Sequence, residues 1–499
     1  LKRSKKLVHE LDNLIETKQG ETSHLRLITY SMAGNGTKFD KWGHAVNTSS
    51  NECISAINWY YEQVLGYGRE KRVILEAANH DDKCVLANIL AAHFIASSDP
   101  SKSQAHVRAA SFRLEKATPY EKAVFYSIIA LISPDRDDDA TFEFHSQLLD
   151  EYPKDMLSAK RAQLFCFHTG RPDLSLILIE KILSVNEHEE YIHAMHAFPL
   201  LELGRNEEAL VAAERAYTIK KNDTWAQHCI CHVHQSECNF KDAIEFMENC
   251  SPLWTSHSSF LYTHNWWHVA LCQLEQCRST TKPLQIYDKH FLKELEREDA
   301  VPSEIYTSAL ALLFRLYVRG VIESNNPRVK DMAKRVSDKR FWHLELQLDM
   351  FIIWALSQAG GDPSAEDVIN SLKSRISSKC EKNQNQMKKP LQLAEAVYAY
   401  GKRNYEGAYK LLGPNFNAID YKMIGASDEQ VDVFNEMWYM VLLNTGRAVQ
   451  VIMALEKDVK KRNVPFLWGL LALGYTNIGS NEAAFASAKV RELEAAYSD

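Results

Sequence analysis

A repeated pattern of turn and helix is the feature of this 499-residue sequence that most limits its fold. Three segments align on their turns: FHTGRPDLSLILIEKIL from Phe167, LELGRNEEALVAAERAY from Leu201 and HQSECNFKDAIEFMENC from His234. The turn residue moves from Gly170 to Gly204 to Cys238 in two equal steps, and the same arrangement returns around Gly446 and Gly479. Self-similarity at a fixed period predicts a stack of equivalent supersecondary units.

The apolar residues after each turn have helical spacing. Ala209, Ala213 and Ala216 recur at steps of three or four after the second turn, and long period-two alternation is missing from the chain. A helix–turn–helix unit of about 34 residues, which is the step between these turns, is typical of the tetratricopeptide repeat. The sequence therefore predicts an all-α protein, an α-solenoid (right-handed superhelix) of tetratricopeptide-like repeats. We expect the solenoid over residues 39–499, after an N-terminal helical extension over residues 1–38.

Composition limits the partners of such a protein. The net charge is −7 and Lys and Arg form no long stripe, so we expect no nucleic acid partner. No run of about 18 apolar residues occurs, which argues against membrane insertion. The ten cysteines form no Cys-x-x-Cys pair and no apolar signal segment opens the sequence, so a cytoplasmic location is expected. The oligomeric state stays open.

Histidine is concentrated between residues 188 and 290, which hold ten of the nineteen. Residues three or four apart share a helix face, and three predicted first helices carry such pairs: His193 with His196, His228 with His232, and His264 with His268. Because first helices line the concave surface of these solenoids, we expect a His/Trp-rich pocket within residues 190–290. The steps from His196 to His232 to His268 are equal to each other but differ from the turn spacing, so the three pairs are not equivalent in the repeat.

The primary hypothesis is that a small organic molecule or a peptide segment binds in this concave groove. The predicted ligand-binding residues are His193, His196, Trp225, Tyr262, Asn265, Trp266, Trp267, Glu275 and Asp288. Indole and phenol rings would supply an aromatic wall for an organic ligand, and the polar groups would orient it.

The alternative is an enzyme of small-molecule metabolism. Its catalytic residues would be His228, His232, His264 and His268, used for general acid–base or metal-assisted chemistry. Paired histidines, or three of them with Glu275, would also suit a zinc or non-haem iron ion, although no cofactor is required. The zinc-peptidase motif is absent, because Cys229 and Asn265 stand where that motif has Glu.

A third hypothesis is a non-catalytic protein–protein scaffold. In that case the groove would hold the tail of a partner protein, and the histidine and tryptophan side chains would only satisfy one another at helix crossings.

Several stretches of the sequence resemble the tetratricopeptide repeat protein 38 family, and plant-type members most closely. They are YIHAMHAFPLLELGRNEEAL, TWAQHCICHVHQ, THNWWHVALCQLE, LQIYDKH and GASDEQVDVFNEMWYMVLLNTGR, and the resemblance runs from about Phe39 onward. It implies an all-α superhelix of tetratricopeptide-like units and a cytosolic location, but no settled activity. The matching positions are His193, His228, His232, His264, Asn265, Trp266, Trp267, His268 and Asp288.

The sequence departs from that family pattern at His196 and His234, where an apolar residue is expected, and at Ser236, where related chains carry His. A histidine set rearranged in this way would fit a specialised member with an altered ligand or altered chemistry.

Overall fold

The structure is a computed structural model that describes residues 36–276, 281–359 and 363–498. Most of the predicted N-terminal extension, residues 1–35, lies outside this part of the chain. The described chain begins with a short antiparallel ladder in which Thr37 pairs with Asn47. The predicted boundary between residues 38 and 39 therefore falls inside a strand.

The N-terminal part comprises β1 (Thr37–Phe39), β2 (Ala45–Asn47), α2 (Asn51–Leu65), α3 (Val73–His80), α4 (Val85–Ile95), α5 (Pro100–Arg113), η2 (Leu114–Lys116), α6 (Pro119–Ile132) and α7 (Asp138–Glu151). The central hairpins comprise α8 (Met156–His168), α9 (Pro172–Leu183), α10 (Ile192–Glu202), α11 (Asn206–Ile219), α12 (Thr224–Ser236), α13 (Phe240–Cys250), η3 (Ser251–Ser256), α14 (Ser259–Gln276), α15 (Thr281–Ile286), η4 (Tyr287–Phe291) and α16 (Leu292–Glu294).

The C-terminal part comprises α17 (Pro302–Val318), α18 (Pro327–Val336), η5 (Lys339–Phe341), α19 (Leu346–Ala359), α20 (Ala365–Ser377), α21 (Glu381–Gln386), α22 (Lys388–Gly401), α23 (Tyr405–Leu412), η6 (Ala418–Ile424), α24 (Asp428–Asn444), α25 (Ala448–Asp458), α26 (Pro465–Asn477) and α27 (Glu482–Ser498). The predicted all-α solenoid of tetratricopeptide-like hairpins is confirmed, with one short β-ladder added at its N-terminal end.

The turns lie at the positions that the repeat period predicts. Gly170, Gly204 and Cys238 all have positive φ, at 67°, 72° and 61°. A residue in the left-handed region ends the first helix of each hairpin, so the chain can reverse and begin the second helix. Ala209 and Ala213 of α11 are fully buried, because small side chains let the two helices of a hairpin approach closely.

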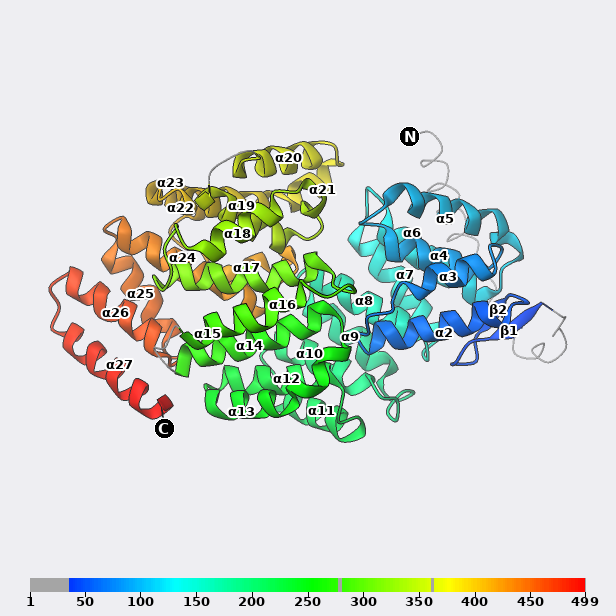
Figure 1. The fold of residues 1–499 in the computed structure, drawn as a ribbon, viewed down its shortest axis with the longest axis horizontal. Helices are drawn as coiled ribbons and strands as arrows, with labels where there is room; N and C mark the ends of the chain where they lie inside the picture. The colour runs from blue at the N-terminus through cyan, green and yellow to red at the C-terminus, as the bar shows by residue number, and fades with distance from the viewer. Residues whose placement is uncertain (1–35, 277–280, 360–362, 499) are drawn as a thin grey trace.

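The apolar core extends along the successive hairpins as three clusters of buried residues. One apolar cluster runs from residue 46 to 195, a second links Tyr67 and residues 176–261, and a third runs from 231 to 471. Figure 1 shows the result, with α2–α7 at one end of the molecule and α26–α27 at the other. Each unit buries its apolar face on its neighbours, as expected for a solenoid.

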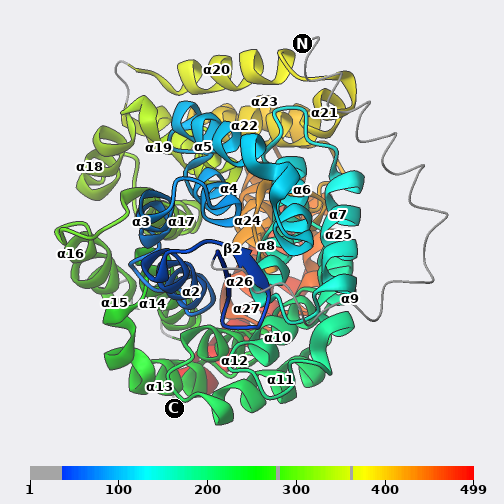
Figure 2. The same cartoon turned by 90° about the vertical axis from the view of Figure 1, so that its right-hand side faces the viewer.

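The superhelix also closes on itself. Helix α24 packs on α17, α27 packs on α14, and η6 packs on α8 although these two elements are far apart in the sequence. Figure 2 looks along the length of the molecule, so that α24, α26 and α27 are seen behind the N-terminal helices. The contacts bring elements of the C-terminal third of the chain against α8, α14 and α17. Within the described residues, no helix is both long enough and apolar enough to cross a membrane.

Candidate metal centre

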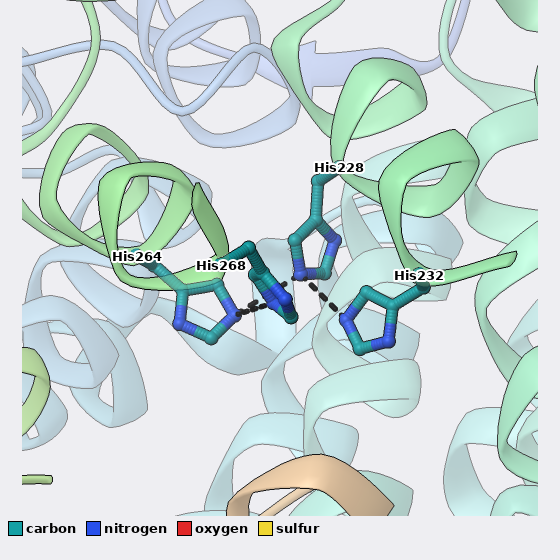
Figure 3. Close-up of side chains that lie close together, drawn as sticks. All are labelled: His228, His232, His264 and His268. Carbon is teal, nitrogen blue, oxygen red and sulfur yellow. Dashed lines mark hydrogen bonds between the residues drawn. The ribbon is translucent and has the colours of Figure 1, made fainter. Parts of the chain in front are cut away.

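Four imidazoles from α12 and α14 converge in the interior (Figure 3). The Nε2 atom of His228 lies 2.9 Å from that of His232 and 3.0 Å from that of His264. The Nε2 atom of His268 lies 3.3 Å from that of His264. One nitrogen from each ring falls within 4.8 Å of all the others, and no ring is more than 5% exposed.

Helix periodicity places these side chains. His228 and His232 are one turn apart on α12, and His264 and His268 are one turn apart on α14, so each pair leaves its helix on one side. Asp223 caps the start of α12 by accepting hydrogen bonds from the backbone N–H groups of the second and third residues that follow it. Helices α12 and α14 are first helices of adjacent hairpins and pack directly on each other.

Aromatic rings enclose the four imidazoles. Trp225 stacks on His228 at 4.3 Å between ring centroids. Phe260 and Trp267 stack on His264 at 5.1 and 5.5 Å. These contacts fill the surroundings of the cluster, so its convergent nitrogens face one another and not an open groove.

The second nitrogens of two rings have hydrogen-bond acceptors. Nδ1 of His268 lies 2.9 Å from Oε1 of Gln235, and Nδ1 of His232 lies 3.0 Å from Oε1 of Glu429. With Oε1 of Gln235 facing His268 and a carboxylate facing His232, both oxygens accept, which places the ring proton on Nδ1 and a lone pair on Nε2 of each ring. Nδ1 of His228 is buried without a partner in the described chain.

With lone pairs on Nε2 of His232 and His268, every choice of tautomer for His228 and His264 leaves at least one contact between two lone pairs or two N–H groups. An additional proton on His232, beside Glu429, removes this conflict, and so does a metal ion that accepts all four lone pairs. Reversing the amide of Gln235, which would place the ring proton of His268 on Nε2, removes it without a charge.

Burial dominates the ionisation of the cluster. It lowers the pKa of His264 to about 3, and it lowers the pKa of His228 and of His268 well below the usual value. Burial would also lower the pKa of His232, but the carboxylate of Glu429 outweighs it and raises that pKa. For Glu429 burial acts upward, yet the interaction with His232 lowers its pKa to about 2.

Further charges surround Glu429. Nζ of Lys422 lies 2.5 Å from Oε2 of Glu202 and 2.6 Å from Oδ1 of Asp428. Burial raises the pKa of Glu202 to about 7. A space of about 10 Å³, the size of one water molecule, lies beside Glu202 and Lys422.

His193 and His196 do not join the cluster, contrary to expectation. Nε2 of His193 contacts the backbone oxygen of Glu187 at 2.8 Å, and Nε2 of His196 lies 3.7 Å from Oε1 of Glu180. Both histidines lie on α10, but neither stands at the repeat position that His228 and His232 occupy on α12.

The repeat register gives the physical reason. His228 and His232 lie ten and six residues before the turn at Cys238, and the equivalent residues before Gly204 are Ala194 and Phe198. His196 is two residues before Phe198, which rotates its side chain by about 200° around the helix, and His193 is one residue before Ala194, which rotates it by about 100°. Phe198 therefore faces the cluster, with its ring 6.2 Å from His228.

Trp225 and Trp267 pack on the cluster as described, whereas Tyr262 and Trp266 contact His290. The hydroxyl of Tyr262 lies 2.9 Å from Nδ1 of His290, and the indole of Trp266 stacks on the same ring at 3.6 Å. Asn265 is fully buried, and neither atom of its side-chain amide has a partner in the described chain.

The two predicted carboxylates also lie elsewhere. Asp288 accepts two hydrogen bonds from Arg328, at 2.9 and 2.6 Å. Glu275 accepts from Arg319 at 2.6 Å and from Arg462 at 3.3 Å. Glu275 lines a cleft of about 310 Å³ between the ends of α14 and α17 and the α26–α27 hairpin. It is thus no fourth ligand for three histidines.

The predicted site residues do not include two residues that contact the cluster. Helical spacing in the sequence already places Gln235 on the same face of α12 as His228 and His232, so it could have been included. Glu429 stands far beyond His232 in the sequence, in the last quarter of the chain. No periodic signal links the two, because their contact arises where one turn of the superhelix meets another.

A second polar arrangement has a structural role. Asp349, His343 and Ser371 lie in line, at 2.8 and 2.9 Å. Asp349 also accepts from the backbone N–H of His343, whose φ is 60°. Ser371 stands inside α20, where backbone N–H groups are used by the helix, so it has no donors for an oxyanion. The arrangement ties α20 to the start of α19.

The sequence matches no family model. Among solved structures, the human IFIT1 dimer with m7Gppp-AAAA is similar to this chain at 12% sequence identity and a TM-score of 0.40. The similarity covers 92% of this chain and 96% of that chain.

Proposed function

We propose that this tetratricopeptide-type solenoid binds one transition-metal dication through the Nε2 atoms of His228, His232, His264 and His268. The observation that carries the proposal is the convergence of four buried imidazole nitrogens within 4.8 Å. Tetrahedral zinc with Zn–N bonds of about 2.0–2.1 Å has nitrogen–nitrogen separations of about 3.3 Å. The separations of 2.9 and 3.0 Å would lengthen slightly and that of 3.3 Å already fits, while the remaining nitrogen pairs, which lie within 4.8 Å, would have to shorten toward 3.3 Å.

The donor set favours a borderline metal ion. Imidazole suits zinc, copper, iron and nickel, whereas calcium and magnesium prefer oxygen ligands. Two of the rings have the outer partners that metal-bound histidines usually have, Gln235 for His268 and Glu429 for His232. Zinc is the first choice, because four protein ligands in a closed tetrahedron are typical of structural zinc sites.

The surroundings favour a structural ion over the earlier alternatives. A catalytic zinc keeps one position open for water or substrate, and here all four ligands would come from the protein. Trp225, Phe260 and Trp267 pack on the rings where an organic molecule or a peptide would have to lie. The bound ion would join α12 to α14. Membership of the tetratricopeptide repeat protein 38 family stays a prediction from the sequence.

Elemental analysis of untagged protein tests the proposal. We expect about one zinc per chain after incubation with zinc and desalting. His264→Gln and His268→Gln should each lose the ion, because an amide is a poor ligand for zinc at a buried nitrogen site. His234→Gln is the matched control, since His234 lies on α12 outside the cluster, and it should keep the ion.

Circular dichroism establishes that the variants remain helical. A stoichiometry near zero for the parent chain, or full retention of zinc by folded His264→Gln, would remove the proposed site.

A further inference from the structure

We infer that the ion acts as a clasp between the central hairpins and the C-terminal third of the chain. With the ion bound, residues 418–429 stay docked on α8, α10 and α12, and without it this docking loosens. The inference rests on the proposed ion site and adds a role for it.

The first contact of the clasp is that between His232 and Glu429. Oε1 of Glu429 lies 3.0 Å from Nδ1 of His232, whose other nitrogen points at the centre of the cluster. A carboxylate in this position orients a metal-bound imidazole and makes it a stronger ligand. The coupling is reciprocal, so an ion on Nε2 also strengthens the hydrogen bond from Nδ1–H to Glu429. Ion binding and docking of the first turn of α24 therefore favour each other.

Charge balance points the same way. Three carboxylates, those of Glu202, Asp428 and Glu429, gather beside the cluster, and Lys422 is the ammonium ion-paired with two of them. Lys422 pairs with Glu202 and Asp428, so Glu429 is the carboxylate of this group that faces the histidines directly. A dication at the four histidines would add a counter-charge beside Glu429.

The rest of α24 has an independent anchor. Arg315 of α17 donates to Oε1 of Glu436 at 2.7 Å. Its bonds to the backbone oxygen of Glu429 at 2.8 Å and to Asp432 at 3.2 Å reach into residues 418–432 and limit how far these residues loosen. Loss of the ion would weaken the contact between α24 and α12, while the contacts between α24 and α17 would remain. We therefore expect local loosening of residues 418–432, while residues 436–444 remain protected.

Hydrogen–deuterium exchange of the full chain tests the clasp, with zinc bound and after chelation. Amides in residues 418–432 should exchange several-fold faster without zinc. Residues 100–113 in α5 and 436–444 in α24 should not change. If residues 418–432 exchange equally in both states of a chain that binds one zinc, the clasp is wrong although the ion site stands.

Glu429→Gln tests the residue that makes the coupling. It should weaken zinc binding by about 10- to 100-fold and raise exchange in residues 418–432 even at saturating zinc. Glu406→Gln is the matched control, because Glu406 pairs with Arg447 in an exposed ion pair far from the site. Unchanged zinc affinity in folded Glu429→Gln would overturn the inference. A parent chain that binds no zinc would remove both the site and the clasp.

Discussion

At the scale of single residues, Lys160 of α8 is the most unusual ionisable group near the candidate site. Its side chain is 2% exposed, and Nζ lies 4.6 Å from the ring centre of Tyr67 and 4.8 Å from that of Trp225. Burial lowers the pKa of Lys160 to about 7. The aromatic faces attract the ammonium, but they do not replace the water that it has lost.

Lys160→Met should therefore change how stability depends on pH. Between about pH 7 and pH 10 the unfolded amine holds a proton that the folded amine lacks, so this group makes the free energy of unfolding rise with pH. The slope from one such group is about 1.4 kcal/mol per pH unit. Below pH 7 both states hold the proton, and burial of the charged amine destabilises the fold.

Urea unfolding at pH 7, 8 and 9 measures this effect. We expect the advantage of Lys160→Met over the parent chain to be largest at pH 7 and to shrink as the pH rises. A constant difference across that range would contradict a lowered pKa in the folded state. Lys382→Met, at an exposed ion pair, is the control and should show no such trend.

At the scale of elements, the hairpin turn is the unit that the sequence repeats. Gly170 and Gly204 follow α8 and α10 with nearly the same φ, 67° and 72°. Their surroundings differ. A Cβ on Gly204 would have no neighbour within 4 Å, whereas a Cβ on Gly170 would lie 3.0 Å from the backbone nitrogen of Met423 and 3.3 Å from the carbonyl carbon of Lys422.

The variants Gly204→Ala and Gly170→Ala form a matched pair. Both should lose about 1 kcal/mol, because alanine is disfavoured at positive φ. Gly170→Ala should lose about 1–3 kcal/mol more, since its methyl group would press on the backbone near η6. Urea unfolding gives both values. Equal losses would show that η6 does not pack tightly on the first turn of the superhelix.

At the scale of the whole molecule, a buried charge network holds distant parts of the chain together. Arg319 donates to Glu275 of α14 and to Glu436 of α24, both at 2.6 Å. Arg315 reaches the same Glu436 at 2.7 Å, and Arg462 pairs with Glu275 at 3.3 Å. Glu436 is fully buried, so the network lies inside the closed superhelix and joins α14, α17 and α24.

Glu436→Gln should strongly destabilise the protein. The change removes the fully buried carboxylate that Arg315 and Arg319 share and leaves them Asp432 and Glu275 respectively. Breaking a buried network from one side costs about 3–5 kcal/mol. Glu406→Gln removes an exposed pair with Arg447 and should change the free energy of unfolding little. Urea unfolding of both variants gives the two free energies of unfolding to be compared. Similar small losses would mean that the network contributes little to closure of the superhelix.

The local part of this architecture could be predicted from the sequence. The repeat period placed the turns at Gly170, Gly204 and Cys238, and helical spacing put two histidines on one face of α12 and two on one face of α14. These features depend on residues within one or two hairpins. The repeat register also predicts that His193 and His196 point away from the cluster, because Ala194 and Phe198 occupy the positions equivalent to His228 and His232.

The sequence by itself therefore determined the helices, their turns and the two histidine pairs, because these follow from the period of the helix and the period of the repeat. Only the tertiary structure decided that the superhelix closes, that aromatic rings fill the space around the histidines, and that Glu429 meets His232. Such contacts depend on the small rotation between successive hairpins, summed over many units. No spacing between nearby residues in the sequence predicts this accumulated rotation.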